Sequence, residues 1–264
     1  MGEAARRWAE ELEAWAIPQE ILDAAPESPW GFPPALFAVA GDPGAAPESP
    51  STRRAAEALP SGGTVLDVGA GGGAGSIPLA GRAGRLIAVD QSEDMLAAFA
   101  SKADDVGVAH EEICGLWPDV AARAPVADVV VCHHVLYNVA DAVPFLEALT
   151  DHARRRVVME MTEVHPQVAT APLWRHFHGL ARPAGPRADD ALAVLAEMGL
   201  EVSVERFRRD PHPAHRDRAE WVAFTRRRLC LAPGREPEVE AQLGEGGMAR
   251  PQELVALWWD GRAR

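Results

Sequence analysis

The sequence predicts a doubly wound α/β fold, and three observations support this prediction. Short, nearly continuous apolar runs, such as residues 64–69, 85–90 and 126–133, alternate with stretches of helical periodicity. Strands of this kind are typical of a parallel sheet that helices cover on both faces. The 264 residues suffice for one such domain, and 47% of them are apolar, as in globular proteins.

The first 51 residues are predicted to form a helical cap and a linker. Ala5, Trp8, Leu12 and Trp15 are three or four residues apart, which gives one apolar face of a helix. The prolines that follow allow only short helical pieces, such as residues 35–40. This segment also contains two aromatic residues that are predicted either to line a substrate pocket or only to pack, Trp30 and Phe32.

Residues 52–264 are predicted to form the main domain. The strands are expected near residues 64–69, 85–90, 126–133, 155–161, 200–207 and 253–260. The helices are expected near residues 92–103, 140–152, 187–199, 216–231 and 237–243. Helical insertions are expected near 165–185 and 209–250. Because α/β sheets bind ligands at the carboxyl ends of their strands, the cap and the insertions should shape a pocket there.

A glycine-rich turn, VLDVGAGGGAG, follows the first predicted strand. Its glycines let the backbone approach a ligand without Cβ clashes, and the helix expected after the turn would offer free N–H groups to a polar or anionic group. Asp90 ends the next strand about 20 residues later, where a carboxylate can accept hydrogen bonds from ribose hydroxyls. The turn and Asp90 together predict a nucleoside ligand.

Asp67 argues against a dinucleotide. Gly69, Gly71 and Ala74 satisfy a relaxed G-x-G-x-x-G/A pattern, which is a weak signal by itself. The dinucleotide fingerprint normally has an apolar residue two places before its first glycine, and here that place holds the carboxylate of Asp67, which suits a ligand's ammonium group. An NAD-dependent oxidoreductase stays open as an alternative.

Three segments, VLDVGAGGGAGSIPLA, IAVDQSEDML and ADVVVCHHVLYNV, resemble conserved blocks of the class I S-adenosylmethionine-dependent methyltransferases. The resemblance implies a Rossmann-like fold with a mostly parallel, seven-stranded sheet whose last strand, ELVALWWD, is inserted antiparallel. It also implies S-adenosyl-L-methionine as the cofactor and S-adenosyl-L-homocysteine as the product.

The resemblance further implies cofactor-binding residues. The methionine moiety would be lined by Asp67, Gly69, Ala70, Gly71 and Gly73, and His133 would lie beside the methyl group. Asp90 would hold the ribose, and Gln91 and Met95 would flank the adenine. Gly115, Leu116 and Trp117 occupy the stretch that supplies an adenine-edge contact. The family often has an aspartate in that stretch and this sequence has none, so the contact would come from the backbone or from Trp117.

Methyl transfer from a sulfonium needs alignment, and it needs a base only when the acceptor carries a proton. The first candidate bases are His134, His133 and Tyr137, and the others are Glu160, Glu163, His165, His176 and His178. Each can equally be a strand cap or a surface group. Trp174 and His178 share a helix face and, with Glu160, are candidate substrate contacts.

Composition narrows the choice of partners. The net charge of −13 would repel a phosphate backbone, so a small-molecule acceptor is predicted rather than nucleic acid. The three cysteines form no CxxC pair, and no metal site is expected. Because no apolar run approaches the ~20 residues of a membrane span, a cytoplasmic protein without membrane attachment is predicted. A noncatalytic S-adenosylmethionine-binding protein is the second alternative, and the sequence does not indicate an oligomeric state.

Overall fold

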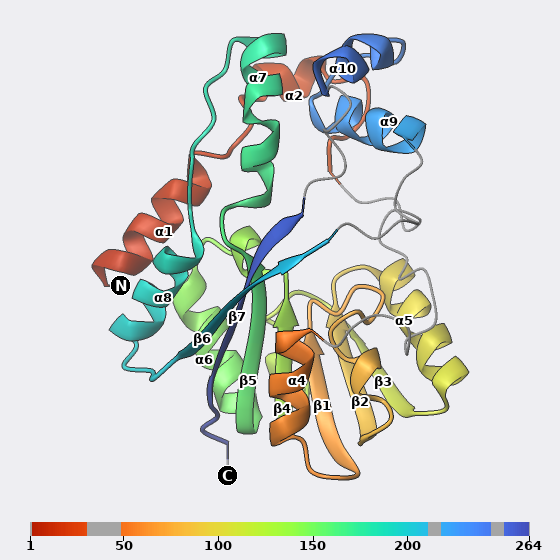
Figure 1. The fold of residues 1–264 in the computed structure, drawn as a ribbon, viewed down its shortest axis with the longest axis vertical. Coiled ribbons are helices and arrows are strands. Elements are labelled where there is room, and N and C mark those ends of the chain that lie inside the picture. The colour runs from red at the N-terminus through yellow and green to blue at the C-terminus, as the bar shows by residue number, and fades with distance from the viewer. Residues whose placement is uncertain (1, 31–48, 211–217, 244–250, 264) are drawn as a thin grey trace.

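The computed structural model describes residues 2–30, 49–210, 218–243 and 251–263, and it contains a seven-stranded sheet of order β3-β2-β1-β4-β5-β7-β6 (Figure 1). The strands are β1 (Gly63–Val68), β2 (Ala83–Asp90), β3 (Ala109–Cys114), β4 (Ala127–His133), β5 (Ala153–Thr162), β6 (Ser203–Arg209) and β7 (Gln252–Asp260). Strands β1 to β5 pair in parallel, whereas β7 lies antiparallel between β5 and β6. The predicted fold class and the inserted last strand are confirmed.

Helices cover both faces of the sheet (Figure 1). One face packs against α1 (Glu3–Glu13), α6 (Ala142–His152) and α8 (Ala188–Glu197). On this side Trp8 is fully buried, and its Nε1 donates a hydrogen bond of 2.8 Å to the carbonyl oxygen of Val139. The other face packs against α4 (Pro50–Ala58), the 3-10 helix η1 (Ile77–Leu79) and α5 (Glu93–Val106). The continuous apolar runs of the central strands are explained by this burial on both sides.

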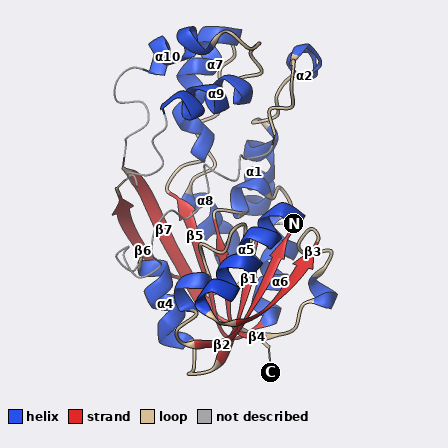
Figure 2. Cartoon of the chain, turned by 90° about the vertical axis from the view of Figure 1, so that its right-hand side faces the viewer, coloured by secondary structure: helices blue, strands red, loops and turns tan. Residues whose placement is uncertain are grey.

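A separate helical cluster lies beyond the end of the sheet at which β4 and β5 finish (Figures 1 and 2). It contains α2 (Gln19–Ala24), α7 (Ala171–His178), α9 (Arg218–Arg228) and α10 (Glu236–Leu243). Its own apolar core includes Ile17, Trp174, Leu229 and Val239. The 3-10 helix η4 (Pro166–Thr170) joins this cluster directly to β5. The cluster therefore stands over the carboxyl ends of the parallel strands.

Two expectations about local structure are corrected. Residues 69–82 form turns and η1, not the α-helix expected after the glycine-rich turn, because this stretch contains several glycines and Pro78, which all disfavour a helix. Strand β3 was not anticipated, since AHEEIC is an edge strand whose polar residues hide the apolar pattern.

Other features bear on the predicted segments. Helix α4 crosses the predicted division between residues 51 and 52. The short helix expected at 35–40 lies outside the described residues. None of the helices in the described ranges is long and apolar enough to cross a bilayer.

Candidate active site

Asp67 is a buried carboxylate near the end of β1. Its side chain is only 1% exposed, and one oxygen accepts a hydrogen bond of 2.6 Å from Ser76 Oγ. Burial, together with the nearby charge of Asp90, raises the pKa of Asp67 to about 7, although the hydrogen bond from Ser76 opposes this shift. No ion pair involves Asp67 among the residues that the structure describes. A cation beside this group would compensate a charge that the protein leaves unpaired.

Asp90, at the end of β2, holds the glycine-rich turn. Its two carboxylate oxygens accept hydrogen bonds from the backbone N–H of Gly71, at 2.8 Å, and of Ser92, at 2.9 Å. Gly71 has a φ of +50°, and a Cβ there would find no atom within 4 Å. The backbone at Gly71 therefore borders open space next to a carboxylate, which is a suitable place for a hydroxyl-bearing ligand.

The neighbouring glycines have other reasons to lack a side chain. A Cβ at Gly69 would lie 2.3 Å from Val135 Cγ2, and one at Gly73 would lie 2.7 Å from Ile77 Cγ1. Both residues have positive φ angles, of 71° and 83°. Gly69 and Gly73 thus keep the turn tightly packed, whereas Gly71 faces the open side. Ala70 is buried in the core beneath the turn.

His133 ends β4 next to Asp67. A Cβ at Gly75 would lie 3.3 Å from both His133 Nδ1 and an oxygen of Asp67, so Gly75 provides room between these groups. His133 Nε2 is buried and has no hydrogen-bond partner in the described part of the chain. Burial lowers the pKa of His133 to about 4, and the imidazole is neutral at pH 7. A buried nitrogen without a partner is costly, and a bound ligand would satisfy it.

The predicted adenine residues divide into two groups. Gly115 donates a backbone hydrogen bond of 3.0 Å to the carbonyl oxygen of Asp90, and Leu116 beside it is 57% exposed. Gln91 is exposed and Met95 is half-buried, both close in sequence to Asp90. Trp117, in contrast, is buried, and its Nε1 donates to the carbonyl oxygen of Phe145 at 3.4 Å. Its indole N–H is therefore engaged with α6.

His134 and Glu160 form a second polar pair, at the ends of β4 and β5. His134 Nε2 lies 3.1 Å from Glu160 Oε1, and the backbone N–H of His134 donates to the carbonyl oxygen of Glu160 at 2.7 Å. His134 has a φ of +61°, which is uncommon for a residue other than glycine. The His134 side chain is one-third exposed, whereas that of Glu160 is almost completely buried.

Two further residues hold Glu160. Arg209 donates to Oε1 at 2.7 Å from β6, and Ser51 Oγ donates to Oε2 at 2.7 Å from α4. Burial alone would raise the pKa of Glu160, but the hydrogen bond from His134 and the positive charge of Arg209 hold it below its ordinary value. Glu160 is therefore ionised, and its Oε1 accepts a hydrogen bond from the N–H at Nε2 of His134. The unprotonated nitrogen of a neutral His134 is then Nδ1.

Tyr137 lies close to this pair, in the 3-10 helix η3 (Leu136–Asn138). Its ring centroid is 6.4 Å from that of His134 and 5.7 Å from that of His165, which stacks on Trp15. Burial and the nearby Glu160 raise the pKa of Tyr137 above its ordinary value. The phenol stays protonated and can donate a hydrogen bond, so it is a poor base.

The remaining predicted residues lie elsewhere. Trp174 and His178 do share a face of α7, with ring centroids 5.0 Å apart, but Trp174 is buried in the core of the helical cluster and His178 Nε2 bonds to the carbonyl oxygen of Leu229. Trp30 is 51% exposed, beside Arg228. Phe32 lies outside the described residues. The structure thus joins Asp67, Asp90 and His133 with the glycines, and His134 with Glu160, and it leaves these aromatic residues apart.

Sequence reasoning missed the residues that support the site. Ser76, Ser51 and Arg209 have no motif of their own, and they meet Asp67 and Glu160 only through the fold.

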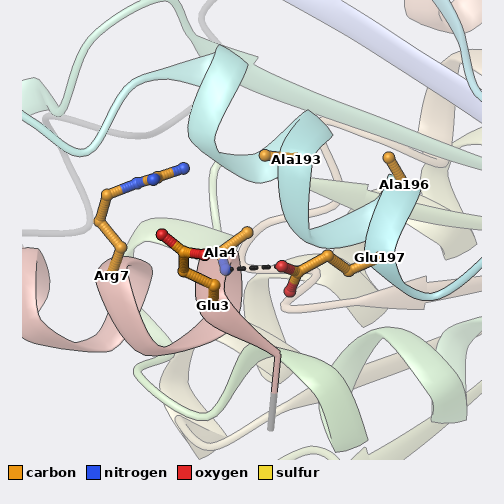
Figure 3. A pocket seen from close by; sticks show the side chains of 6 residues that line it. All are labelled: Glu3, Ala4, Arg7, Ala193, Ala196 and Glu197. Carbon is orange, nitrogen blue, oxygen red and sulfur yellow. Dashed lines mark hydrogen bonds between the residues drawn. The ribbon is translucent and has the colours of Figure 1, made fainter.

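A surface hollow of about 540 Å³ between α1 and α8 (Figure 3) is lined by Glu3, Ala4, Arg7, Ala193, Ala196 and Glu197. None of the residues discussed above lines this hollow, so the candidate site is defined by its converging polar groups.

The part of the chain that contains the candidate site is similar to known methyltransferase domains. The family model described as a methyltransferase domain matches residues 66–157, which include the glycine-rich turn, Asp90, His133 and His134. The chain is 29% identical over 146 residues to a ubiquinone biosynthesis O-methyltransferase of Azorhizobium caulinodans. This match covers 54% of the chain and 58% of the relative, so the chain spans less than two thirds of that protein's length.

Solved structures share the fold at low sequence identity. An S-adenosylmethionine-dependent methyltransferase from Thiobacillus denitrificans, in complex with S-adenosyl-L-homocysteine, aligns with a TM-score of 0.54 and 18% identity over 88% of this chain and 100% of its own. The magnesium protoporphyrin IX methyltransferase of Synechocystis PCC 6803, with bound S-adenosyl-L-homocysteine, aligns with a TM-score of 0.51 and 18% identity over 80% of each chain. These structures show the same fold, and the family model over residues 66–157 confirms the resemblance that the three sequence segments indicated.

Proposed function

We propose that this chain is a class I S-adenosylmethionine-dependent methyltransferase that transfers a methyl group to an oxygen or nitrogen atom of a small-molecule acceptor. One observation carries the proposal: Asp67, Asp90 and the unpartnered Nε2 of His133 converge around a glycine-rich turn that is open at Gly71. The name of the Azorhizobium relative, an O-methyltransferase, favours oxygen as the methylated atom.

Cofactor binding is assigned to residues of this chain by their chemistry. S-adenosyl-L-methionine, when bound, supplies an electrophilic methyl group on a sulfonium. Asp67 would face its ammonium group, Asp90 its ribose hydroxyls, and His133 Nε2 would gain a polar partner. The exposed Leu116 and the half-buried Met95 are suited to the two faces of an adenine ring. The donors and acceptors of the site therefore match the polar groups of this cofactor.

His134 is proposed as the general base. Glu160 fixes Nε2 through its ionised carboxylate, so Nδ1 of the partly exposed imidazole takes the proton that a hydroxyl or ammonium acceptor loses. His133 is less suited to this role, because its Nε2 is buried and its pKa of about 4 makes it a weak base. Tyr137 is proposed to donate a hydrogen bond near the acceptor rather than to remove a proton.

The finer parts of the function remain proposals. The net charge of −13 supports a compact acceptor over nucleic acid, and we propose that the helical cluster above the strands closes one side of the acceptor site. A cytoplasmic location without membrane attachment stays a prediction from the sequence. The main alternatives are a noncatalytic S-adenosylmethionine-binding protein and an NAD-dependent oxidoreductase.

The first experiment titrates S-adenosyl-L-homocysteine and NADH into the protein by calorimetry. We expect micromolar binding of S-adenosyl-L-homocysteine alone, with a loss of at least tenfold in Asp90→Ala, about the effect of one charge-assisted hydrogen bond. Asp94→Ala is the matched control, because Asp94 is an exposed acid in the first turn of α5. Binding of NADH instead, or of neither ligand, would reject the methyltransferase proposal.

The second experiment separates an enzyme from a binding protein. Radiolabelled S-adenosyl-L-methionine is incubated with pools of phenols, alcohols and amines, and methylated products are identified by mass spectrometry. With a positive acceptor, His134→Ala should lower kcat by roughly 10²- to 10⁴-fold, as expected for a general base, with cofactor affinity unchanged. His110→Ala, in β3, is the matched control. Cofactor binding without transfer to any pool would favour the noncatalytic alternative.

A further inference from the structure

The glycine-rich turn lacks the α-helix that would normally anchor it. Residues 69–82 contain only turns and η1 between β1 and β2. Asp90 accepts a hydrogen bond from the N–H of Gly71. Lys102 reaches the turn from α5, and its Nζ donates a hydrogen bond of 2.8 Å to the carbonyl oxygen of Gly72.

Gly72 fits this contact and has no other assigned role. A Cβ at residue 72 would lie 2.9 Å from Lys102 Nζ, which is closer than real contacts allow. A side chain at this position would therefore require the end of the flexible Lys102 side chain to shift. Lys102 is also the single lysine in the sequence, whereas arginine supplies all the other strongly basic side chains.

The ammonium group of Lys102 has few other groups to interact with in the ranges that the structure describes. Its Nζ forms no ion pair with any of the residues that the structure describes, and the carbonyl oxygen of Gly72 is its one hydrogen-bond partner there. The side chain is half-buried, and this burial lowers its pKa. A partly desolvated ammonium group depends strongly on the few acceptors that it has.

We propose that Lys102 is a positioning residue that clamps the glycine-rich turn into its cofactor-binding shape, in place of the missing helix. Asp90 ends β2 and Lys102 lies in α5, so this one β2–α5 unit hydrogen-bonds to the N–H of Gly71 and to the carbonyl oxygen of the next residue, Gly72. This inference rests on the proposed function only in naming the ligand. The hydrogen bonds that hold the turn do not depend on which ligand it binds.

The test compares Lys102→Met with Ser101→Met, a matched change at the exposed neighbouring position. We expect Lys102→Met to weaken S-adenosyl-L-homocysteine binding by roughly five- to thirtyfold, the loss expected for one hydrogen bond that preorganises a binding turn. Hydrogen exchange of the amides in residues 69–80, measured without ligand, should become faster. Ser101→Met should match the wild type in both measurements, and Lys102→Arg should recover part of the affinity.

A double-mutant cycle separates the clamp from a general loss of stability. Gly72→Ala should weaken binding as far as its Cβ displaces Lys102 Nζ, and Lys102→Met should therefore cost less affinity in the Gly72→Ala protein than in the wild type, because both changes act on the same contact. Fully additive losses, or exchange and affinity in Lys102→Met that equal those of the wild type, would overturn the proposal. If the wild type itself fails to bind S-adenosyl-L-homocysteine, the proposed function fails, and the ligand-free exchange alone decides on the clamp.

Discussion

Replacement of Asp67 by asparagine should make the protein more stable at high pH. The pKa of Asp67 is about 7 in the folded chain and 3.8 when unperturbed. Between these values the folded state holds a proton that the unfolded chain has released, so the free energy of unfolding falls as the pH rises. The difference in pKa corresponds to about 4 kcal/mol in total, of which about 2.6 kcal/mol falls between pH 5 and 8.

Urea unfolding at a series of pH values measures this difference. In Asp67→Asn the side-chain amide would keep an oxygen for Ser76 Oγ and would not titrate, so the variant lacks the loss of stability that Asp67 causes. His133 and other titrating groups are present in both proteins, and their contributions largely cancel when the two stability curves are subtracted. We expect the variant to gain roughly 2–3 kcal/mol relative to the wild type between pH 5 and 8. Parallel curves for the two proteins would refute the assignment of a raised pKa to Asp67.

The same carboxyl connects stability to cofactor binding. An ammonium group beside Asp67 stabilises the ionised form and lowers its pKa, so binding of S-adenosyl-L-homocysteine near pH 7 should release about half a proton. Calorimetry in phosphate and in Tris, which differ in ionisation enthalpy, measures this number. Asp67→Asn should bind more weakly and release no proton. Equal proton release in both proteins would show that Asp67 does not face the ammonium group.

Three further predictions test the separate roles of neighbouring residues. Gly69→Ala should lower the free energy of unfolding by more than ~2 kcal/mol, because its Cβ would clash with Val135. Gly71→Ala should lower it by only ~1 kcal/mol and should act mainly on cofactor affinity. Equal losses of stability for the two variants in urea unfolding would contradict this prediction. Glu160→Gln should lower the free energy of unfolding by only ~1 kcal/mol, because Arg209 is partly exposed and solvent screens its charge, and it should reduce kcat. An unchanged kcat would argue against the role of His134. Trp174→Ala should lower the free energy of unfolding by about 3–5 kcal/mol, because Trp174 is buried, whereas Trp30→Ala should lower it by less than ~0.5 kcal/mol. If Trp30→Ala instead raised the KM for the acceptor strongly and left stability unchanged, Trp30 would belong to the acceptor site.

The features that could be predicted from the sequence are those that depend on residue spacing or on a run of residues of one type. The spacing of the glycine-rich turn and Asp90 predicted that both belong to one nucleoside site, whereas the hydrogen bond from Gly71 to Asp90 became visible only in the structure. The central strands were also predictable, because burial on both faces makes them continuous apolar runs. Strand β3 was not, since it lies at the sheet edge and is mostly polar.

The supports of the site were not predictable, because they depend on tertiary packing. Ser51 precedes Glu160 by more than a hundred residues, and Arg209 reaches the same carboxylate from β6 across the inserted strand β7. The substrate contacts predicted for Trp174 and His178 rested on a correct helical spacing, but spacing does not say which way a helix face points. In the structure this face packs within the helical cluster.

The two adjacent histidines show how backbone conformation divides the chemistry of the site. His133 still belongs to β4, and its side chain lies beside Asp67, where burial keeps it neutral with one nitrogen unpartnered. The positive φ of His134 ends the strand and aligns its imidazole with the ionised Glu160. Environments that differ in this way give chemically identical side chains different roles. The first histidine is therefore suited to contact a bound ligand, and the second is suited to exchange a proton with the acceptor.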